Sequence, residues 1–173
     1  MSGKKNWRLK KTLARRIEVR PIENSDLQYA WAAYKTGGLS EMGFAKDLDA
    51  PAFKIAFEQA ILTNHHAAWI VQAQTKTRFM PVGIVLGSWA TPHAVYMIVT
   101  GIAWFPWATK RNILEGTVAF FNKIRKEMPW MGYAMNGHKR AYEVCCMHGI
   151  MRRVGTTHVV FPGQSAAVYE GRA

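Results

Sequence analysis

Basic side chains are concentrated at the start of this 173-residue chain. The first 20 residues hold eight Lys or Arg against one acid, Glu18, and so carry +7 of the formal net charge of +12. Those that lie before or at the start of the first expected strand are Lys4, Lys5, Arg8, Lys10, Lys11, Arg15 and Arg16. Such a density of cations can neutralise phosphates and release counterions, which predicts salt-sensitive, sequence-independent contact with DNA.

The same charge pattern is compatible with two other roles for this segment. A solvated tail would aid solubility, and a docking tail would bind an acidic protein. Trp7 is the one aromatic residue of the segment, so the tail itself does not predict a platform for stacking bases. The oligomeric state does not follow from these residues.

The cysteines argue against disulfide and metal chemistry. Cys145 and Cys146 are adjacent and cannot easily pair with each other in regular structure. They are typical of reduced thiols in a cytosolic protein. No Cys-x-x-Cys or His-x-x-x-His spacing occurs, so we expect no metal site. The absence of both a signal-peptide core after Met1 and an apolar run of about 18 residues predicts a cytoplasmic protein without a membrane span.

Hydrophobic periodicity divides the first half of the chain into strands and helices. Alternation predicts a strand at 16–21, and an apolar helical face after the N-cap cluster Asn24 to Asp26 predicts a helix. A second apolar helix follows Pro51. Runs at 67–73 and 81–87 predict an antiparallel hairpin.

The second half continues with a strand at 94–105, a helix at 109–127, a strand at 131–136 and a helix at 138–148. Gly149 ends that helix, and a β-branched strand follows at 156–161. A last short strand at 167–169 fits the pattern. This order predicts one α/β (α+β) domain with a mixed, mostly antiparallel sheet of six to seven strands and about four helices on both faces.

Three segments resemble the GNAT superfamily of acyl-CoA N-acyltransferases. The run from Ile17 to Asp26 is similar to the family's opening "I-x-x-R-x-x-x-x-x-D". The segment Ala103-Trp-Phe-Pro106 stands where the family's fourth strand ends in "V-x-P", and 141–150 stands where the family has "A-x-x-L-Y-x-x-x-G-F". The resemblance covers about residues 16–161. It implies a basic arm at 1–15 and a GNAT-like domain at 16–173.

The resemblance implies a binding site for acetyl-CoA between the fourth and fifth strands. The pantetheine would pair with the fourth strand, and the pyrophosphate would lie at the start of the next helix, where free amides and the helix dipole favour an anion. The corresponding residues are Ala103, Trp104, Phe105, Thr109, Lys110, Arg111 and Asn112. The family's loop glycines correspond to Asn112 and Leu114 in one register and to Leu114 and Gly116 in another, so at most one is present. The charges of Lys110 and Arg111 are the substitute that we expect.

Acetyl transfer needs a base for the amine and an acid for the departing thiolate. The family often takes the base from a carboxylate near the fourth strand, but no acid lies between Glu58 and Glu115, which leaves His93 or Tyr96 acting through a water. The family's acid corresponds here to Cys145, with Tyr142 three residues earlier. The alternative is that Cys145 is a small buried hydrophobic residue.

Two functions follow from the resemblance. The first is an acetyl-CoA-dependent N-acetyltransferase with weak or lost catalytic motifs. The second is a non-catalytic GNAT-like phage protein that binds virion proteins or DNA through its basic surface, since the chain also resembles GNAT-like proteins of short-tailed phages. An enzyme predicts an open cleft with free amides at 109–112, whereas a scaffold predicts a cleft filled by Trp104, Trp107 or Leu114.

Overall fold

The computed structural model describes residues 16–36, 39, 44–62, 66–89, 97–134, 139–157 and 166–171. Its strands are β1 (Ile17–Pro21), β2 (His66–Gln74), β3 (Phe79–Trp89), β4 (Met97–Trp104), β5 (Trp130–Ala134), β6 (Arg152–Thr157) and β7 (Ala166–Gly171). Its helices are the 3-10 helix η1 (Asn24–Asp26), α2 (Leu27–Lys35), α3 (Ala50–Leu62), α4 (Lys110–Glu127) and α5 (Lys139–Met147). The predicted order of elements is therefore confirmed.

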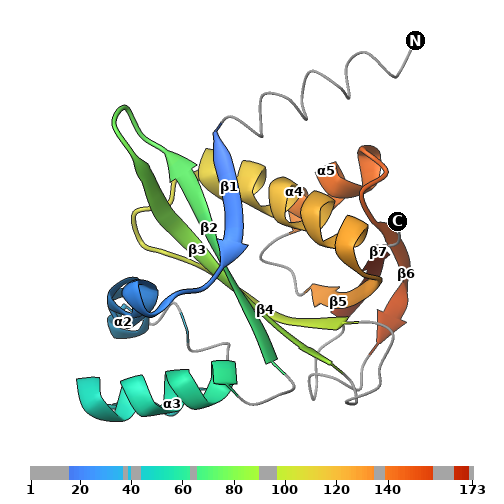
Figure 1. Cartoon of the computed structure of the whole chain (residues 1–173). Coiled ribbons are helices and arrows are strands. Elements are labelled where there is room, and N and C mark those ends of the chain that lie inside the picture. Colours follow the sequence, from blue (N-terminus) through green and yellow to red (C-terminus); the bar gives the residue numbers. More distant parts are fainter. Residues whose placement is uncertain are drawn as a thin grey trace.

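The described strands form one mixed sheet in the order β1-β2-β3-β4-β5-β7-β6. Every neighbouring pair is antiparallel except β4 and β5, which run parallel (Figure 1). The last strand of the chain, β7, is inserted between β5 and β6. The strand predicted at 156–161 begins earlier, at Arg152, and the short strand at 167–169 is part of β7.

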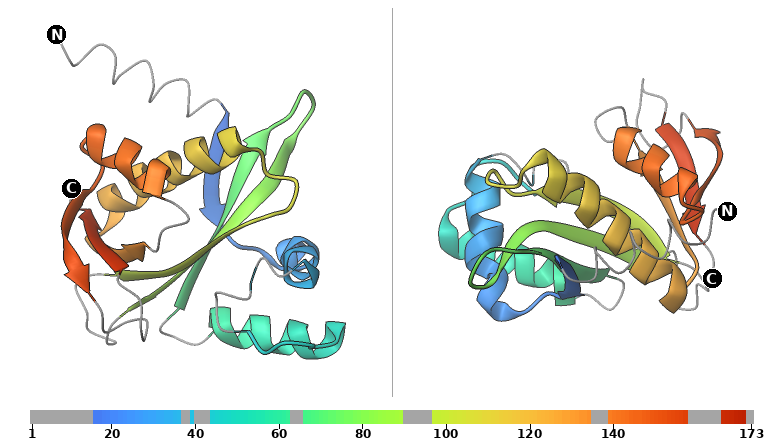
Figure 2. Two further views of the ribbon diagram at one scale, coloured as in Figure 1. Left: turned by 180° about the vertical axis from the view of Figure 1, so that it is seen from behind. Right: turned by 90° about the horizontal axis from the view of Figure 1, so that it is seen from above.

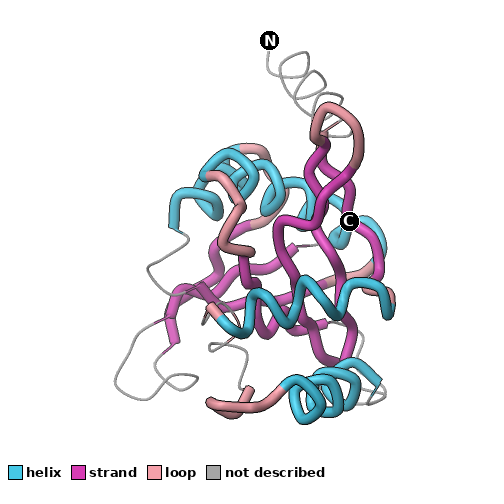
Figure 3. The backbone as a smooth tube through the Cα atoms, turned by 90° about the vertical axis from the view of Figure 1, so that its left-hand side faces the viewer, coloured by secondary structure: helices cyan, strands magenta, loops and turns pink. Residues whose placement is uncertain are grey.

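Helices cover both faces of the sheet, so a core lies on each face (Figure 2). The core beneath α4 and α5 contains Phe120, Phe121, Trp130 and Cys145. The core beneath α2 and α3 contains Phe53, Phe57 and Ile84. The alternation of side chains along the central strands sends neighbouring residues to opposite cores. The same two layers of helix around the strands are seen from the side in Figure 3.

Gly149 ends α5 as the sequence predicts. Its φ of 64° lies in the left-handed region, which favours glycine. Its amide donates to the carbonyl of Cys146 at 3.0 Å, and the amide of Ile150 donates to the carbonyl of Cys145 at 2.9 Å. These two bonds form a Schellman motif, which satisfies carbonyls that the helix end would leave unpaired.

Among the described residues, no helix combines the length and the apolar character that crossing a membrane requires. Within the same ranges, no group of three or more His, Cys, Asp or Glu side chains is arranged to hold a metal ion.

Candidate functional site

The opening between β4 and β5 is the first feature of the candidate site. The two strands pair at only three positions, Met97 with Trp130, Ile98 with Met131, and Val99 with Gly132. Beyond these pairs β4 continues along β3 to Trp104, while β5 continues along β7 to Ala134. The strands therefore diverge, and within the described part of the chain one edge of β4 has no strand partner after Val99.

The hydrogen-bond parity of β4 decides which backbone groups face this opening. The amide of Phe105 donates to the carbonyl of Val82 at 2.9 Å, so Phe105 is hydrogen-bonded toward β3. Hydrogen-bonded positions alternate along an antiparallel ladder. Given the register of Ala103 with Ile84, Ala103 also bonds toward β3, whereas Trp104 and Ile102 direct their amides and carbonyls toward the β5 side.

The alternation shows which of the residues expected to bind the cofactor direct their backbone groups toward β5. Among the described residues, the backbone groups of Trp104 have no partner toward β5. Ala103 faces β3, and both backbone groups of Phe105 are engaged, since its carbonyl accepts the amide of Ala108 at 2.8 Å. Ile102 was missed because the parity of a ladder depends on the partner strand, which the residues of β4 alone do not specify.

A capping box closes part of the start of α4. The Thr109 Oγ1 accepts from the Asn112 amide at 3.1 Å, and the Asn112 Oδ1 accepts from the Thr109 amide at 3.0 Å. These two amides are thus satisfied by side chains of the same turn. The expected anion site at 109–112 therefore keeps the amides of Lys110 and Arg111, which have no acceptor among the described residues.

The two cations at this helix start are exposed but differ in their partners. The Arg111 Nε lies 2.8 Å from the Glu115 Oε1, in an ion pair one helical turn apart. Lys110 forms no ion pair with any residue in the described ranges. An anion bound here would therefore meet one free ammonium, two free amides and the positive end of the helix dipole.

Two of the three residues that a scaffold would use to fill the cleft, Trp104 and Trp107, contact β3 instead. The Trp104 indole lies over Gly83 of β3 and Gly116 of α4, where an added Cβ would come within 2.5 and 2.7 Å of its ring atoms. The Trp107 Nε1 donates to the Pro81 carbonyl at 2.7 Å. Since β3 and β5 lie on opposite sides of β4, neither contact closes the β5 side of the opening.

Several solved acetyltransferase structures share this architecture. Spermidine N-acetyltransferase from Vibrio cholerae, solved with CoA and spermine, matches with a TM-score of 0.64 and 11% identity over 90% of this chain and 94% of that one. A GCN5-related N-acetyltransferase from Brucella melitensis matches with a TM-score of 0.61 and 14% identity over 90% and 75%. The chain has the GNAT fold. No protein-family model and no curated protein sequence matches it.

A third match supports the same assignment. A probable acetyltransferase of the GNAT family from Chromobacterium violaceum has a TM-score of 0.60 and 11% identity over 90% of this chain and 81% of that one. Identities this low establish the fold and leave the activity to be argued from the residues themselves.

Within the GNAT fold, both proton-donor candidates on α5 lie in the core. Cys145 is 0% exposed, and burial, with a smaller contribution from Cys146, raises the pKa of its thiol to about 12. Tyr142 is 4% exposed and packs 4.9 Å from the ring of Tyr169. Burial, followed by Cys145 and Tyr169, raises the pKa of the Tyr142 hydroxyl far above its ordinary value. The burial of Cys145 agrees with the alternative that it is a small buried hydrophobic residue of the core.

This burial predicts different reactivities for the two adjacent thiols. In the native protein at pH 8, we expect Cys146, which is half-buried, to react with an aromatic disulfide reagent and Cys145 to stay protected. A Cys146→Ser variant should then show almost no reactive thiol until denaturant is added, and one thiol afterwards. Rapid labelling of folded Cys146→Ser protein would contradict the buried position of Cys145.

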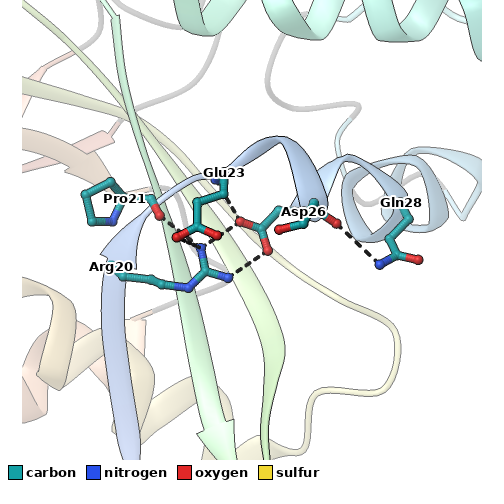
Figure 4. A network of polar contacts seen from close by, with 6 residues as sticks. Arg20, Pro21, Glu23, Asp26 and Gln28 are labelled. Atoms are coloured by element: carbon teal, nitrogen blue, oxygen red, sulfur yellow. Dashed lines mark hydrogen bonds and ion pairs between the residues drawn. The ribbon is translucent and has the colours of Figure 1, made fainter.

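The "I-x-x-R-x-x-x-x-x-D" run of the GNAT resemblance has a structural explanation. Arg20 and Asp26 form a two-bonded ion pair, with Nη1 to Oδ2 at 2.7 Å and Nη2 to Oδ1 at 2.8 Å (Figure 4). The Asp26 Oδ2 also accepts the Glu23 amide at 2.8 Å, so it caps η1 and makes no side-chain cap for α2. This bond with Asp26 raises the pKa of Arg20, although desolvation opposes it.

Other expected site residues lie outside the described ranges. They are His93 and Tyr96, expected as bases, and the arm residues Lys4, Lys5, Lys10, Lys11, Arg8 and Arg15. Arg16 is described and exposed, next to the first residue of β1.

Proposed function

We propose that this chain is an acetyl-CoA-dependent N-acetyltransferase of the GNAT type, with weak chemical catalysis. The observation that carries the proposal is the divergence of β4 from β5 after Val99, which leaves the backbone groups of Ile102 and Trp104 without a partner on the β5 side among the described residues. A pantetheine arm carries amides that can pair with such an edge. Its pyrophosphate is the anion that the free amides of Lys110 and Arg111 suit.

The described residues are better suited to binding acetyl-CoA than to the proton transfers that the reaction requires. Acetyl-CoA supplies the thioester. The acceptor nitrogen forms a bond to the carbonyl carbon, the carbon–sulfur bond breaks, and the amine proton must leave while the thiolate gains one. With Cys145 buried and its pKa at about 12, the position that corresponds to the family's acid offers no accessible proton donor. Water then protonates the thiolate, and the rate depends on the fraction of neutral amine.

Calorimetric titration with acetyl-CoA at moderate salt tests this site. We expect micromolar binding that Lys110→Glu weakens at least about tenfold, because a carboxylate replaces the one unpaired ammonium beside the free amides. The matched control is Lys126→Glu, at the exposed far end of the same helix, which should leave affinity unchanged. Absence of binding at millimolar acetyl-CoA, or equal losses in both variants, would refute the site.

The buried acid position favours a second candidate, a GNAT-like protein without catalysis that binds protein partners or DNA through its basic surface. A phage virion is the setting that the resemblance implies for it. An assay of thiol release from acetyl-CoA with a panel of amines distinguishes the two candidates. The non-catalytic protein should release no thiol with any amine, although circular dichroism shows that it is folded. Amine-dependent thiol release lost in Lys110→Glu would instead support the enzyme.

A further inference from the structure

Five exposed cations gather at one end of the sheet, and we call them the basic end. They are Arg16 before β1, Lys76 and Arg78 in the turn between β2 and β3, and Lys110 and Arg111 at the start of α4. In Figures 1 and 2 the start of β1, the turn of the β2–β3 hairpin and the start of α4 lie toward the same end of the molecule. Three segments far apart in the sequence therefore contribute charge to one surface.

A hollow joins these segments. Its volume is ≈ 300 Å³, and its lining includes Arg16 just before β1, Gln74 and Thr75 where β2 ends, and Arg111 and Asn112 from α4. The turn beside it is held by Thr75, whose amide and hydroxyl both donate to the Arg78 carbonyl, at 2.8 and 2.7 Å. These bonds fix the turn that carries Lys76 and Arg78, which follow Thr75 of the lining directly in the chain.

Little negative charge balances the basic end. Glu115 lines the hollow, but it is paired with Arg111. Arg16, Lys76, Arg78 and Lys110 form no ion pair within the described part of the chain. Four uncompensated cations at one end make a positive surface that suits a polyanion.

Two exposed aromatic rings adjoin the basic end. Phe79 follows Arg78 directly, and Trp107 lies in the loop before α4; each is 37% exposed. The Trp107 Nε1 is bonded to the carbonyl of Pro81, two residues after Phe79, so both rings belong to the same end of β3. Packing against Phe105, with ring centroids 5.1 Å apart, supports the Trp107 ring from within.

We propose that the basic end binds single-stranded nucleic acid. Exposed aromatic faces beside cations are the combination that holds unpaired bases together with their phosphates, and duplex DNA would leave the rings unused. The proposal does not depend on acetyl-CoA binding. It also differs from contact through the arm at 1–15, because it assigns the binding to the hairpin turn and the start of α4.

A fluorescence anisotropy titration with labelled oligo(dT) of 20 nucleotides, repeated at several salt concentrations, tests the proposal. The double variant Lys76→Ala/Arg78→Ala should lower the slope of log K against log[salt] by about 1.4, since each phosphate contact with a single strand contributes about 0.7. The control Lys126→Ala/Arg140→Ala removes the same net charge elsewhere and should leave the slope unchanged. Phe79→Leu should weaken binding about tenfold at constant slope, through lost stacking.

Three outcomes would overturn the proposal. An equal decrease of the salt slope in the two double variants would mean that binding depends on net charge alone. Equal affinity for a 20-base-pair duplex, with no effect of Phe79→Leu, would indicate a duplex surface. Displacement of oligo(dT) by polyglutamate of the same total charge would indicate an acidic protein partner. Acetyl-CoA titration of Lys76→Ala/Arg78→Ala should match the unmodified protein, which separates a failure here from a failure of the acetyl-CoA site.

Discussion

Asp26→Ala should lower the free energy of unfolding by about 3 kcal/mol, the largest loss that we expect from one charged side chain. Asp26 is 1% exposed and accepts both guanidinium bonds of Arg20 together with the Glu23 amide. Its removal leaves the Arg20 side chain, which is 22% exposed, without its buried partner, and leaves the Glu23 amide without its side-chain acceptor. Chemical denaturation monitored by tryptophan fluorescence measures the loss.

A double-mutant cycle separates the pair from the packing around it. Arg20→Leu/Asp26→Leu should be more stable than either single Leu variant, because no buried charge is left alone. The matched surface control is Glu58→Ala, which breaks the exposed contact with Lys54 at 3.8 Å and should cost no more than about 0.5 kcal/mol. Equal losses for Asp26→Ala and Glu58→Ala would show that the pair carries no special role.

Gly116→Ala should lower the free energy of unfolding by about 2 kcal/mol, although alanine is the better helix former. Gly116 is buried in α4, and an added Cβ would lie 2.7 Å from the Trp104 ring and 2.9 Å from a Val71 methyl group. Real Cβ atoms do not approach so closely, so the helix or the indole must shift. For a chain of this size, the loss corresponds to a melting temperature lower by about 6 °C.

The control for Gly116 is Gly155→Ala in β6, where an added Cβ would meet nothing within 4 Å. We expect that variant to stay within about 0.5 kcal/mol of the unmodified protein. Trp104→Phe shortens the ring that the new Cβ would meet, so it should reduce the cost of Gly116→Ala when the two are combined. An unchanged melting temperature in Gly116→Ala alone would refute the packing.

Gly116 shows how a residue can match a functional pattern for a structural reason. Its position suggested a surviving glycine of a phosphate loop. In the structure it is buried in the second turn of α4 against the indole of Trp104, which also contacts Gly83 of β3. Spacing along the sequence identifies the glycine, but it does not show that the Trp104 ring occupies the space that the missing side chain leaves.

The order of strands and helices, and the ends of α4 and α5, could be predicted because they depend on local chemistry. Periodicity over a few residues marks a helix face or a strand, and caps such as Thr109 and Gly149 act within one turn. The acyl-CoA N-acyltransferase resemblance predicted the GNAT fold that the solved structures support. The sequence by itself therefore determined the fold class and the approximate place of the candidate site.

Only the tertiary structure decided what the site contains. The insertion of β7 between β5 and β6 joins segments that are distant in the chain. The burial of Cys145 depends on α4 and the sheet packed against α5. The choice of Ile102 and Trp104 as the residues facing β5 depends on ladder parity, since a shift of one residue would reverse it. These properties arise between elements, where no pattern within one element can specify them.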